Sequence, residues 1–541
     1  MLTQKYIHAF KSFFPYGLIF YAFLIIVIPA NAHNTSSAHI LENNSLKLTF
    51  QTPFAGVSGW EVKEHAPNIN KNLILAGDQL ILHGTIASKS IEEWTTIAGG
   101  WQIESSKENA LYFRLSGSDL PFVLEKRWEL SNIQWQAHLQ ISITPLKDIP
   151  DIELSILLGP GIGERPVRGL GISENLYSYT EIIYHNGSEA QTFRFEDAGE
   201  RKDFTSVGPY KWVGLHSRYF LLMLVNASSS AMPTEFFSET PKEPIFFPSN
   251  PAFETRLSIP VPLEKLENGK KQNFSWKIFG GGKSYQALKQ NDLQGMLYNS
   301  LWQWMRWLTI GIGTVLYAIQ SLVVNWGVAI ILLALVVRIL IYPLAKRSMV
   351  AQKEFVDIQK KIQPEIQEIK RSYKGGEQSE RILMVYERYR ISPFAGLKPL
   401  LIVAIQIPIF MALFHLLGQA FELRNTPFLW IDTLAEPDKL FSFGFDLPFF
   451  GAYFNLLPLL MSLTNLLSIK IMPSPVEAEG GWFKRNISLI LMAIAFFLLF
   501  YSFPAGMVLY WAMANVFHVL HTLWMGRSKK PKDGQQLTDT L

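Results

Sequence analysis

The strongest constraint on this chain is a series of long apolar stretches, all of which lie after residue 324. A helix needs about 17 to 25 mostly apolar residues to cross the roughly 30 Å of hydrocarbon in a bilayer. Stretches of this kind cover residues 325–344, 399–420, 450–470, 486–503 and 507–525. They predict a core of five transmembrane helices in the C-terminal part of the chain.

The composition supports a membrane protein. Only 17% of the 541 residues are charged, whereas about a quarter are charged in typical soluble domains. The formal net charge is +4, which does not indicate a nucleic-acid partner. Cysteine is absent from the sequence, and this excludes disulfides, thiolate catalysis and cysteine-based metal sites.

A shorter apolar stretch near the start has two interpretations. It follows Lys5 and Lys11 and ends in Ala30-Asn31-Ala32, the small-residue pattern of a signal peptidase site. Residues 1–32 are therefore either a signal peptide or an N-terminal membrane anchor, and the sequence leaves both open. Either one directs residue 33 onward across the membrane.

Residues 33–300 follow a different pattern. In "QWQAHLQISI" apolar and polar residues alternate from Trp135 to Ile143, as in a strand with one buried face. Short runs of the same kind recur between turn residues, so we expect a large antiparallel β-sandwich. Its acidic residues suggest either a carboxylate pair for sugar chemistry or, as we prefer, a solvated loop; they are Glu196, Asp197, Glu200 and Asp203.

Charge predicts the orientation of the helices. Residues 346–398 carry twelve Lys or Arg against seven Asp or Glu, an excess that marks the cytoplasmic side, and residues 526–541 form a basic tail on that side. Residues 301–324 are rich in tryptophan and contain Arg306, which favours an amphipathic helix at the membrane interface. Residues 325–345 then form the first transmembrane helix, and residues 399–525 form four more.

The basic segment 346–398 also has a helical pattern. Its apolar residues recur at spacings of three and four, then "KGGEQ" interrupts the pattern, and apolar residues continue on a second helix; the first set is Phe355, Ile358, Ile362, Ile366, Ile369 and Tyr373, and the second is Ile382, Tyr386 and Tyr389. This predicts a helical hairpin. It is either a self-packed loop or an arm that docks partners.

Four polar residues interrupt the predicted spans. Arg338, Gln406, Asn465 and Asn515 would be costly in lipid unless they share a hydrated interior. Arg338 lies about 20 Å along a helix from Asn325, so extension of its side chain to the interface is the alternative. His518 and His521 share a helical face, which indicates packing more readily than a metal site.

Several of these segments are similar to motifs of one family. The chain resembles the YidC-type membrane protein insertases, the bacterial branch of the Oxa family, most strongly over residues 325–525. The motifs are "NWGVAIILLALVVRILIYPL", "QPEIQEIKRSYK", "ISPFAGLKPLLIVAIQIPIFMALF" and "FPAGMVLYWAMAN". The family often carries glutamines late in its final helix, where this chain has His521 and Thr522.

The resemblance implies a function and a place. Such proteins move hydrophobic segments of new membrane proteins from the cytoplasm into the bacterial inner membrane, alone or with the Sec translocon. It implies a periplasmic sandwich, a cytoplasmic hairpin that recruits the ribosome or targeting factors, contact with membrane lipids, and neither an enzymatic activity nor a cofactor or metal. It gives no reason to expect sequence-specific nucleic-acid binding.

The resemblance also assigns roles to residues. Arg338, Gln406, Asn465 and Asn515 would line a substrate groove open to the cytoplasm. An apolar surface along which the substrate slides would consist of Ile409, Phe410, Leu413, Phe414, Leu491, Ile494 and Leu498. Helix turns and packing would depend on Pro343, Pro408, Pro504, Gly506, Tyr510 and Trp511.

Two other classes of function compete with this one. A secondary transporter or channel also needs polar residues within its spans, although the sequence shows no internal repeat. A membrane-tethered carbohydrate enzyme would use the sandwich. The sequence has no Gly-rich phosphate loop and no GxSxG motif.

Overall fold

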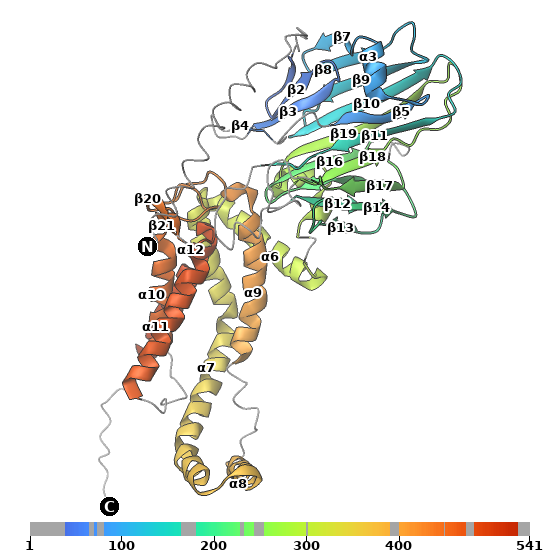
Figure 1. Cartoon of the computed structure of the whole chain (residues 1–541). Coiled ribbons are helices and arrows are strands. Elements are labelled where there is room, and N and C mark those ends of the chain that lie inside the picture. The colour runs from blue at the N-terminus through green and yellow to red at the C-terminus, as the bar shows by residue number, and fades with distance from the viewer. Residues whose placement is uncertain are drawn as a thin grey trace, which may run out of the picture.

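A computed structural model describes residues 38–63, 70–72, 80–163, 180–227, 232–242, 254–298, 301–389, 400–447, 450–471 and 481–527. It consists of a β-rich part at one end and a helical part at the other (Figure 1). The predicted signal peptide or anchor, residues 1–32, lies outside the described residues, as does most of the predicted basic tail, residues 526–541.

The β-rich part contains three antiparallel sheets among the described residues. The largest has the order β13 (Ala190–Phe193), β12 (Glu181–His185), β15 (Trp212–His216), β16 (Phe220–Asn226), β19 (Gln272–Gly282), β10 (Gln136–Pro145), β9 (Phe122–Leu130), β8 (Ala110–Leu115) and β7 (Gln102–Lys107). The second has the order β14 (Arg201–Thr205), β17 (Glu235–Glu239), β18 (Arg256–Pro260), β11 (Ile152–Leu158), β5 (Ile81–Ile86) and β6 (Lys89–Ser90). The third joins β1 (Ala38–Glu42), β2 (Leu46–Gln51), β3 (Gly56–Lys63) and β4 (Asn70–Asn72). A short helix, α3 (Ile91–Ile97), follows β6.

The alternating pattern of the sequence explains the buried face of these strands. In β10 the side chains of Ala137, Leu139, Ile141 and Ile143 are all buried in the common core, so the predicted β-sandwich is confirmed. The four acidic residues between 196 and 203 are exposed. This fits the solvated interpretation, although Asp203 lies in strand β14 rather than in a loop.

The helical part follows the sandwich in the sequence. It contains α5 (Tyr285–Gln290), η2 (Gln294–Met296), α6 (Gln303–Val323), α7 (Trp326–Ser372), α8 (Gly375–Arg388), α9 (Leu400–Gln419), η4 (Phe421–Leu423), α10 (Leu456–Ile471), α11 (Gly481–Phe500) and α12 (Ala505–Arg527). Two helices in the described part of the chain are long and apolar enough to cross a membrane, α6 and the segment Trp326–Leu344 of α7. Shorter apolar segments lie in α9, α10 and α11, at Gln406–Gln419, Leu456–Ser468 and Leu489–Phe500.

One predicted span begins later than the sequence suggested. Residues 450–470 were expected to form one helix, but β21 (Gly451–Phe454) pairs with β20 (Phe441–Leu447), and α10 begins at Leu456. Aromatic residues favour strands, and an apolar run does not by itself distinguish a strand from a helix. Asp438 also fixes the start of α10, because its Oδ2 accepts hydrogen bonds from the Leu456 and Leu457 amides at 2.7 and 3.0 Å.

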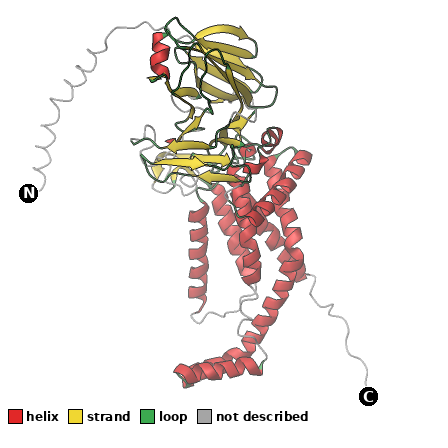
Figure 2. Ribbon diagram, turned by 90° about the vertical axis from the view of Figure 1, so that its right-hand side faces the viewer, coloured by secondary structure: helices red, strands yellow, loops and turns green. Residues whose placement is uncertain are grey.

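The first apolar span and the first arm of the hairpin form one continuous helix, α7. It passes through Pro343 and Pro364, so no break separates residues 345 and 346. Beyond the bundle, α7 folds against α8 around the buried residues Ile362, Ile366 and Val385, and the pair projects away from the other helices (Figure 2). At the turn, Nε2 of Gln378 donates to the Tyr373 carbonyl at 2.6 Å.

The sandwich contacts the segment that follows α9. The Phe421 ring lies against Gly282 at the end of β19, where an added Cβ would come within 2.3 Å of the ring. The same ring lies 5.5 Å from that of Trp135, centroid to centroid. Nε of Arg218 donates to the Gly418 carbonyl at the end of α9, at 2.9 Å. These contacts join the sandwich directly to the helical part.

Candidate functional site

A polar contact between two long helices joins Arg338 on α7 to His518 on α12. Nη2 of the half-buried Arg338 donates a hydrogen bond to Nδ1 of His518. One helical turn further along each helix, the rings of Tyr342 and His521 meet edge to face, with centroids 4.8 Å apart. Residues three or four apart share a helical face, so the two contacts form adjacent layers of one interface.

Two side chains beside this pair have buried polar atoms without hydrogen-bond partners. Among the described residues, no partner is found for Nδ2 of Asn515 or for either ring nitrogen of His521. A buried polar group without a partner costs about 1–3 kcal/mol. The arrangement therefore favours water or an incoming polar group between α7 and α12.

The other two predicted groove residues lie on separate helices. Gln406 on α9 and Asn465 on α10 are both half-buried, and no hydrogen bond within the described part of the chain joins either one to Arg338. The structure thus brings Arg338 to His518 and, through an electrostatic contact, to Tyr510. A groove shared by all four predicted residues stays a prediction.

The residues predicted for an apolar sliding surface fall into two sets. On α9, Leu413 is 3% exposed, and the Phe410 ring packs 4.8 Å from that of Trp511, so these side chains point into the bundle. Ile409 and Phe414 are partly buried against the same core. On α11, Leu491 and Ile494 are 60% and 47% exposed, while Leu498 is intermediate. Only the α11 set presents an open apolar face.

The segment that contains Leu434 and Glu436 lies close to the start of α12 and fixes it by hydrogen bonds. The Ala505 and Gly506 amides donate to the carbonyls of Glu436 and Leu434 at 2.7 and 2.9 Å. An added Cβ at Gly506 would lie 3.2 Å from the Leu434 oxygen, which leaves little room for a side chain. Pro504 precedes this helix, and Tyr510 is buried within it.

Pro343 and Pro408 are among the residues predicted for helix turns and packing. Both lie inside helices, in α7 and α9. Proline is tolerated inside a membrane-spanning helix because neighbouring groups can satisfy the freed carbonyl.

Sequence reasoning missed the role of His518. The histidine pair was interpreted as packing, and Tyr342 was considered only as part of a motif. A signal was present, because His518 follows Asn515 by three residues and so shares its helical face. No cluster of three metal-binding side chains is found among the described residues.

Comparison with known proteins identifies relatives of this chain. A family model described as "60Kd inner membrane protein" matches residues 318–533. A membrane protein insertase YidC of Syntrophobacter fumaroxidans is 28% identical over 391 residues, which cover 70% of this chain and 66% of the relative. The YidC of Treponema denticola is 25% identical over 529 residues, covering 91% and 86%. For most of these relatives the match spans less than two thirds of their length, for example 56% of the YidC of a Janthinobacterium species.

Solved structures give weaker similarities. A crystal structure of an active YidC insertase is 15% identical, and the match covers 94% of this chain and 97% of that chain with a TM-score of 0.35. A putative aldose 1-epimerase from Escherichia coli is 10% identical, and the match covers 46% of this chain and 99% of that chain with a TM-score of 0.32.

Proposed function

From the premise that this chain belongs to the YidC-type membrane protein insertases, we propose that it moves hydrophobic segments of newly made proteins from the cytoplasm into the bacterial inner membrane. The family match begins at residue 318, near the end of α6, and covers α7, α9, α10, α11 and α12. We assign the insertion activity to these five helices and propose that each of them crosses the membrane.

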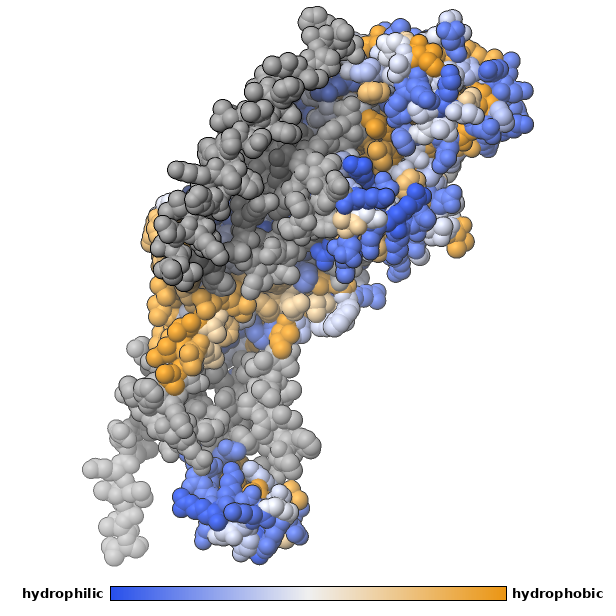
Figure 3. All heavy atoms as spheres, viewed as in Figure 1, coloured by the Kyte–Doolittle hydropathy of each residue, from blue (hydrophilic) through white to orange (hydrophobic). Residues whose placement is uncertain are grey.

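The orientation rests on charge and on tryptophan. The basic hairpin formed by α7 and α8 lies on the cytoplasmic side, and the sandwich lies in the periplasm. Figure 3 supports this division, since hydrophilic residues predominate on the coloured parts of the sandwich and the hairpin that face the viewer, and hydrophobic residues gather on the helical part beside the sandwich. A sixth span between the sandwich and α7 would place the hairpin and the sandwich on the same side of the membrane.

That sixth span would be α6, which we place at the periplasmic interface instead. It lies obliquely across the end of the bundle next to the sandwich (Figure 1). Trp302 and Trp307 at its start are 72% and 69% exposed, and tryptophan prefers the interface to the hydrocarbon. Its buried residues lie along one face, as expected of an amphipathic helix, and are Met305, Thr309, Gly313 and Leu316.

The contact between Arg338 and His518 suggests how the bundle acts. The polar part of a substrate enters between α7 and α12, where Asn515 and His521 have polar atoms without partners, and Arg338 attracts acidic groups. A hydrated entry shortens the distance over which a polar tail must lose water. The apolar segment leaves along the exposed α11 face into lipid, at about 0.8 kcal/mol per CH₂ removed from water.

The hairpin provides the contact with the machinery that delivers the substrate. Ile362, Ile366 and Val385 hold α7 and α8 together, so the outer face of α8 is free for a partner. Leu383 and Met384 on that face are 47% and 52% exposed. We propose the ribosome or a targeting factor as this partner, and the Sec translocon and membrane lipids as partners of the bundle.

The observation that carries the proposal is the family match across the helices that contain Arg338 and His518. Its test is insertion of a short single-span substrate into liposomes that contain only this purified chain, measured by protease protection. Substrate should become protected well above protein-free liposomes. Protection no greater than in protein-free liposomes, with solute flux instead, would indicate a transporter or channel.

A further inference from the structure

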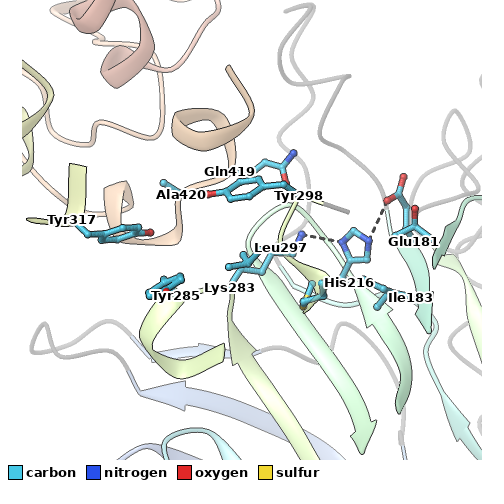
Figure 4. A pocket seen from close by; sticks show the side chains of 12 residues that line it. Glu181, Ile183, His216, Lys283, Tyr285, Leu297, Tyr298, Tyr317, Gln419 and Ala420 are labelled. Atoms are coloured by element: carbon cyan, nitrogen blue, oxygen red, sulfur yellow. Dashed lines mark hydrogen bonds and ion pairs between the residues drawn. The ribbon is translucent and has the colours of Figure 1, made fainter. Parts of the chain in front are cut away.

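Three ionisable side chains from neighbouring strands meet inside the sandwich, close to the helices. Lys283, directly after β19, places its Nζ 2.9 Å from Nδ1 of His216 on β15. The other ring nitrogen of His216, Nε2, lies 3.1 Å from Oε2 of Glu181 on β12. Figure 4 shows the three in line, with a pocket beside them. The proposed insertion mechanism uses none of these groups.

Burial keeps the net charge of this cluster low. It lowers the pKa of Lys283 to about 7, although Glu181 opposes the shift. Burial and then the charge of Lys283 lower the pKa of His216. Burial alone would raise the pKa of Glu181, but the hydrogen bond from His216 and nearby positive charges leave it lowered. Near neutral pH the cluster therefore contains a carboxylate, a neutral imidazole and a partly charged amine.

The adjoining pocket combines this polar wall with aromatic walls. It lies between the sandwich and the end of α9 and is partly open to solvent. Its lining includes the rings of Tyr285, Tyr298 and Tyr317 together with Leu297 and Gln419. The Tyr298 hydroxyl and two of the three N–H groups of Lys283 form no hydrogen bond with the part of the chain that the structure describes.

We propose that this pocket binds a small, uncharged, polyhydroxylated ligand with the chemistry of a sugar ring. Lys283 and Tyr298 would donate hydrogen bonds to its oxygens, since both have unused donors. Tyrosine rings would cover its apolar C–H face, as aromatic side chains do in ligand pockets.

Charge argues against an ionic ligand. Glu181 would repel an anion, and Lys283 would repel a cation. Because the cluster already balances a carboxylate with an amine, it needs no counter-ion from a ligand.

Sheet topology argues against a peptide bound as an added strand. Strand β12 is paired on both sides, by β13 and β15, and β19 is paired by β10 and β16. Strand addition requires a free edge, and these strands offer none.

The test is saturation-transfer NMR with the full chain in lipid nanodiscs. The probes are D-glucose and D-galactose at millimolar concentration, with D-glucuronate and D-glucosamine as the matched anion and cation. At least one neutral hexose should receive saturation, and more than either charged analogue. Lys283→Met should reduce the effect at least about fivefold, as expected for one lost hydrogen bond.

Lys277 on the same strand provides the matched control. It is exposed, so Lys277→Met should leave the signal unchanged. If Lys283→Met does not fold, Tyr298→Phe serves in its place, because it removes only a hydroxyl and should also weaken the signal. Any of three results would overturn the proposal. These are no saturation transfer to either neutral hexose, the same transfer with the pocket variants as with the natural protein, and stronger transfer to glucuronate than to the neutral hexoses. Insertion activity is a separate measurement and should not change in the Tyr298→Phe variant.

Discussion

Arg338 on α7 and His518 on α12 are separated by 180 residues and are joined by a hydrogen bond. The guanidinium is permanently charged, so its partner in the bundle must be an acceptor, and Nδ1 of a neutral imidazole is one. The contact holds the arginine between two helices rather than against lipid. Asn515, three residues before His518 and on the same face of α12, has an amide nitrogen without a partner among the described residues.

The first prediction concerns the charge of Arg338. Arg338→Lys should retain most insertion activity because it keeps the charge, and Arg338→Ala should retain less. The loss in Arg338→Ala should be largest for substrates with acidic translocated tails, since only these gain attraction of about 1–4 kcal/mol in a partly hydrated groove. Insertion of matched acidic and neutral substrates measures the difference; equal small losses for both would favour an arginine that merely reaches the interface.

A second prediction concerns hydration of the site. The natural sequence contains no cysteine, so Arg338→Cys introduces a single thiol. A water-soluble maleimide should label this cysteine in intact membranes, because the unpartnered polar atoms nearby favour water between α7 and α12. A cysteine at the exposed apolar residue Leu491 is the lipid-facing control and should stay unlabelled. Lack of labelling at position 338 would contradict a hydrated groove.

A third prediction concerns His518 as the residue that positions Arg338. His518→Gln offers an amide oxygen in place of Nδ1 and should preserve the preference for acidic tails. His518→Ala leaves the guanidinium without this partner, so the preference for acidic tails should fall while neutral substrates change little. Among the described residues, the Thr522 hydroxyl bonds only to the His518 carbonyl, at 2.9 Å, and Thr522→Val is therefore the control. An equal loss for acidic and neutral substrates in His518→Ala would indicate a role in packing alone.

A fourth prediction separates docking from folding in the hairpin. The exposed Leu383 and Met384 should be needed for delivery, so replacing both with serine should lower ribosome-coupled insertion and leave helix content unchanged. Val385 is 2% exposed, and Val385→Ala should instead loosen the hairpin by about 1–3 kcal/mol. Limited proteolysis and circular dichroism distinguish the two effects. Normal delivery by the double serine variant would show that the outer face of α8 binds no partner.

A fifth prediction follows from the buried amine of the sandwich. The pKa of Lys283 is lowered from 10.5 to about 7 on folding, so between these values the unfolded chain binds more protons than the folded chain. Stability must therefore rise as pH increases from about 7 towards 10. Thermal unfolding of the sandwich should show this rise in the natural protein and a smaller one in Lys283→Met. The same pH dependence of stability in the natural protein and in Lys283→Met would show that folding does not lower the pKa of Lys283.

Local patterns determined the main parts of this protein. Alternation of apolar and polar residues around Leu139 predicted a buried strand face, and the spacing from Ile358 to Ile369 predicted the hairpin helix, because each pattern reflects the geometry of a single element. The length of the apolar stretches indicated a membrane protein for the same reason. The pattern failed at residues 450–454, where an apolar run is compatible with either a strand or a helix. Asp438, 18 residues before Leu456, fixes the start of α10.

The partners of the polar residues were decided by tertiary structure alone. The sequence placed Arg338 within a span but did not show that His518 is its acceptor, and it gave no sign that Glu181, His216 and Lys283 form one cluster. Sequence periodicity records which face of its own helix or strand a side chain occupies. Which faces then meet depends on how whole helices and strands pack against one another. The observed packing is the one in which many side chains are buried together at the lowest free energy, and no single segment determines it.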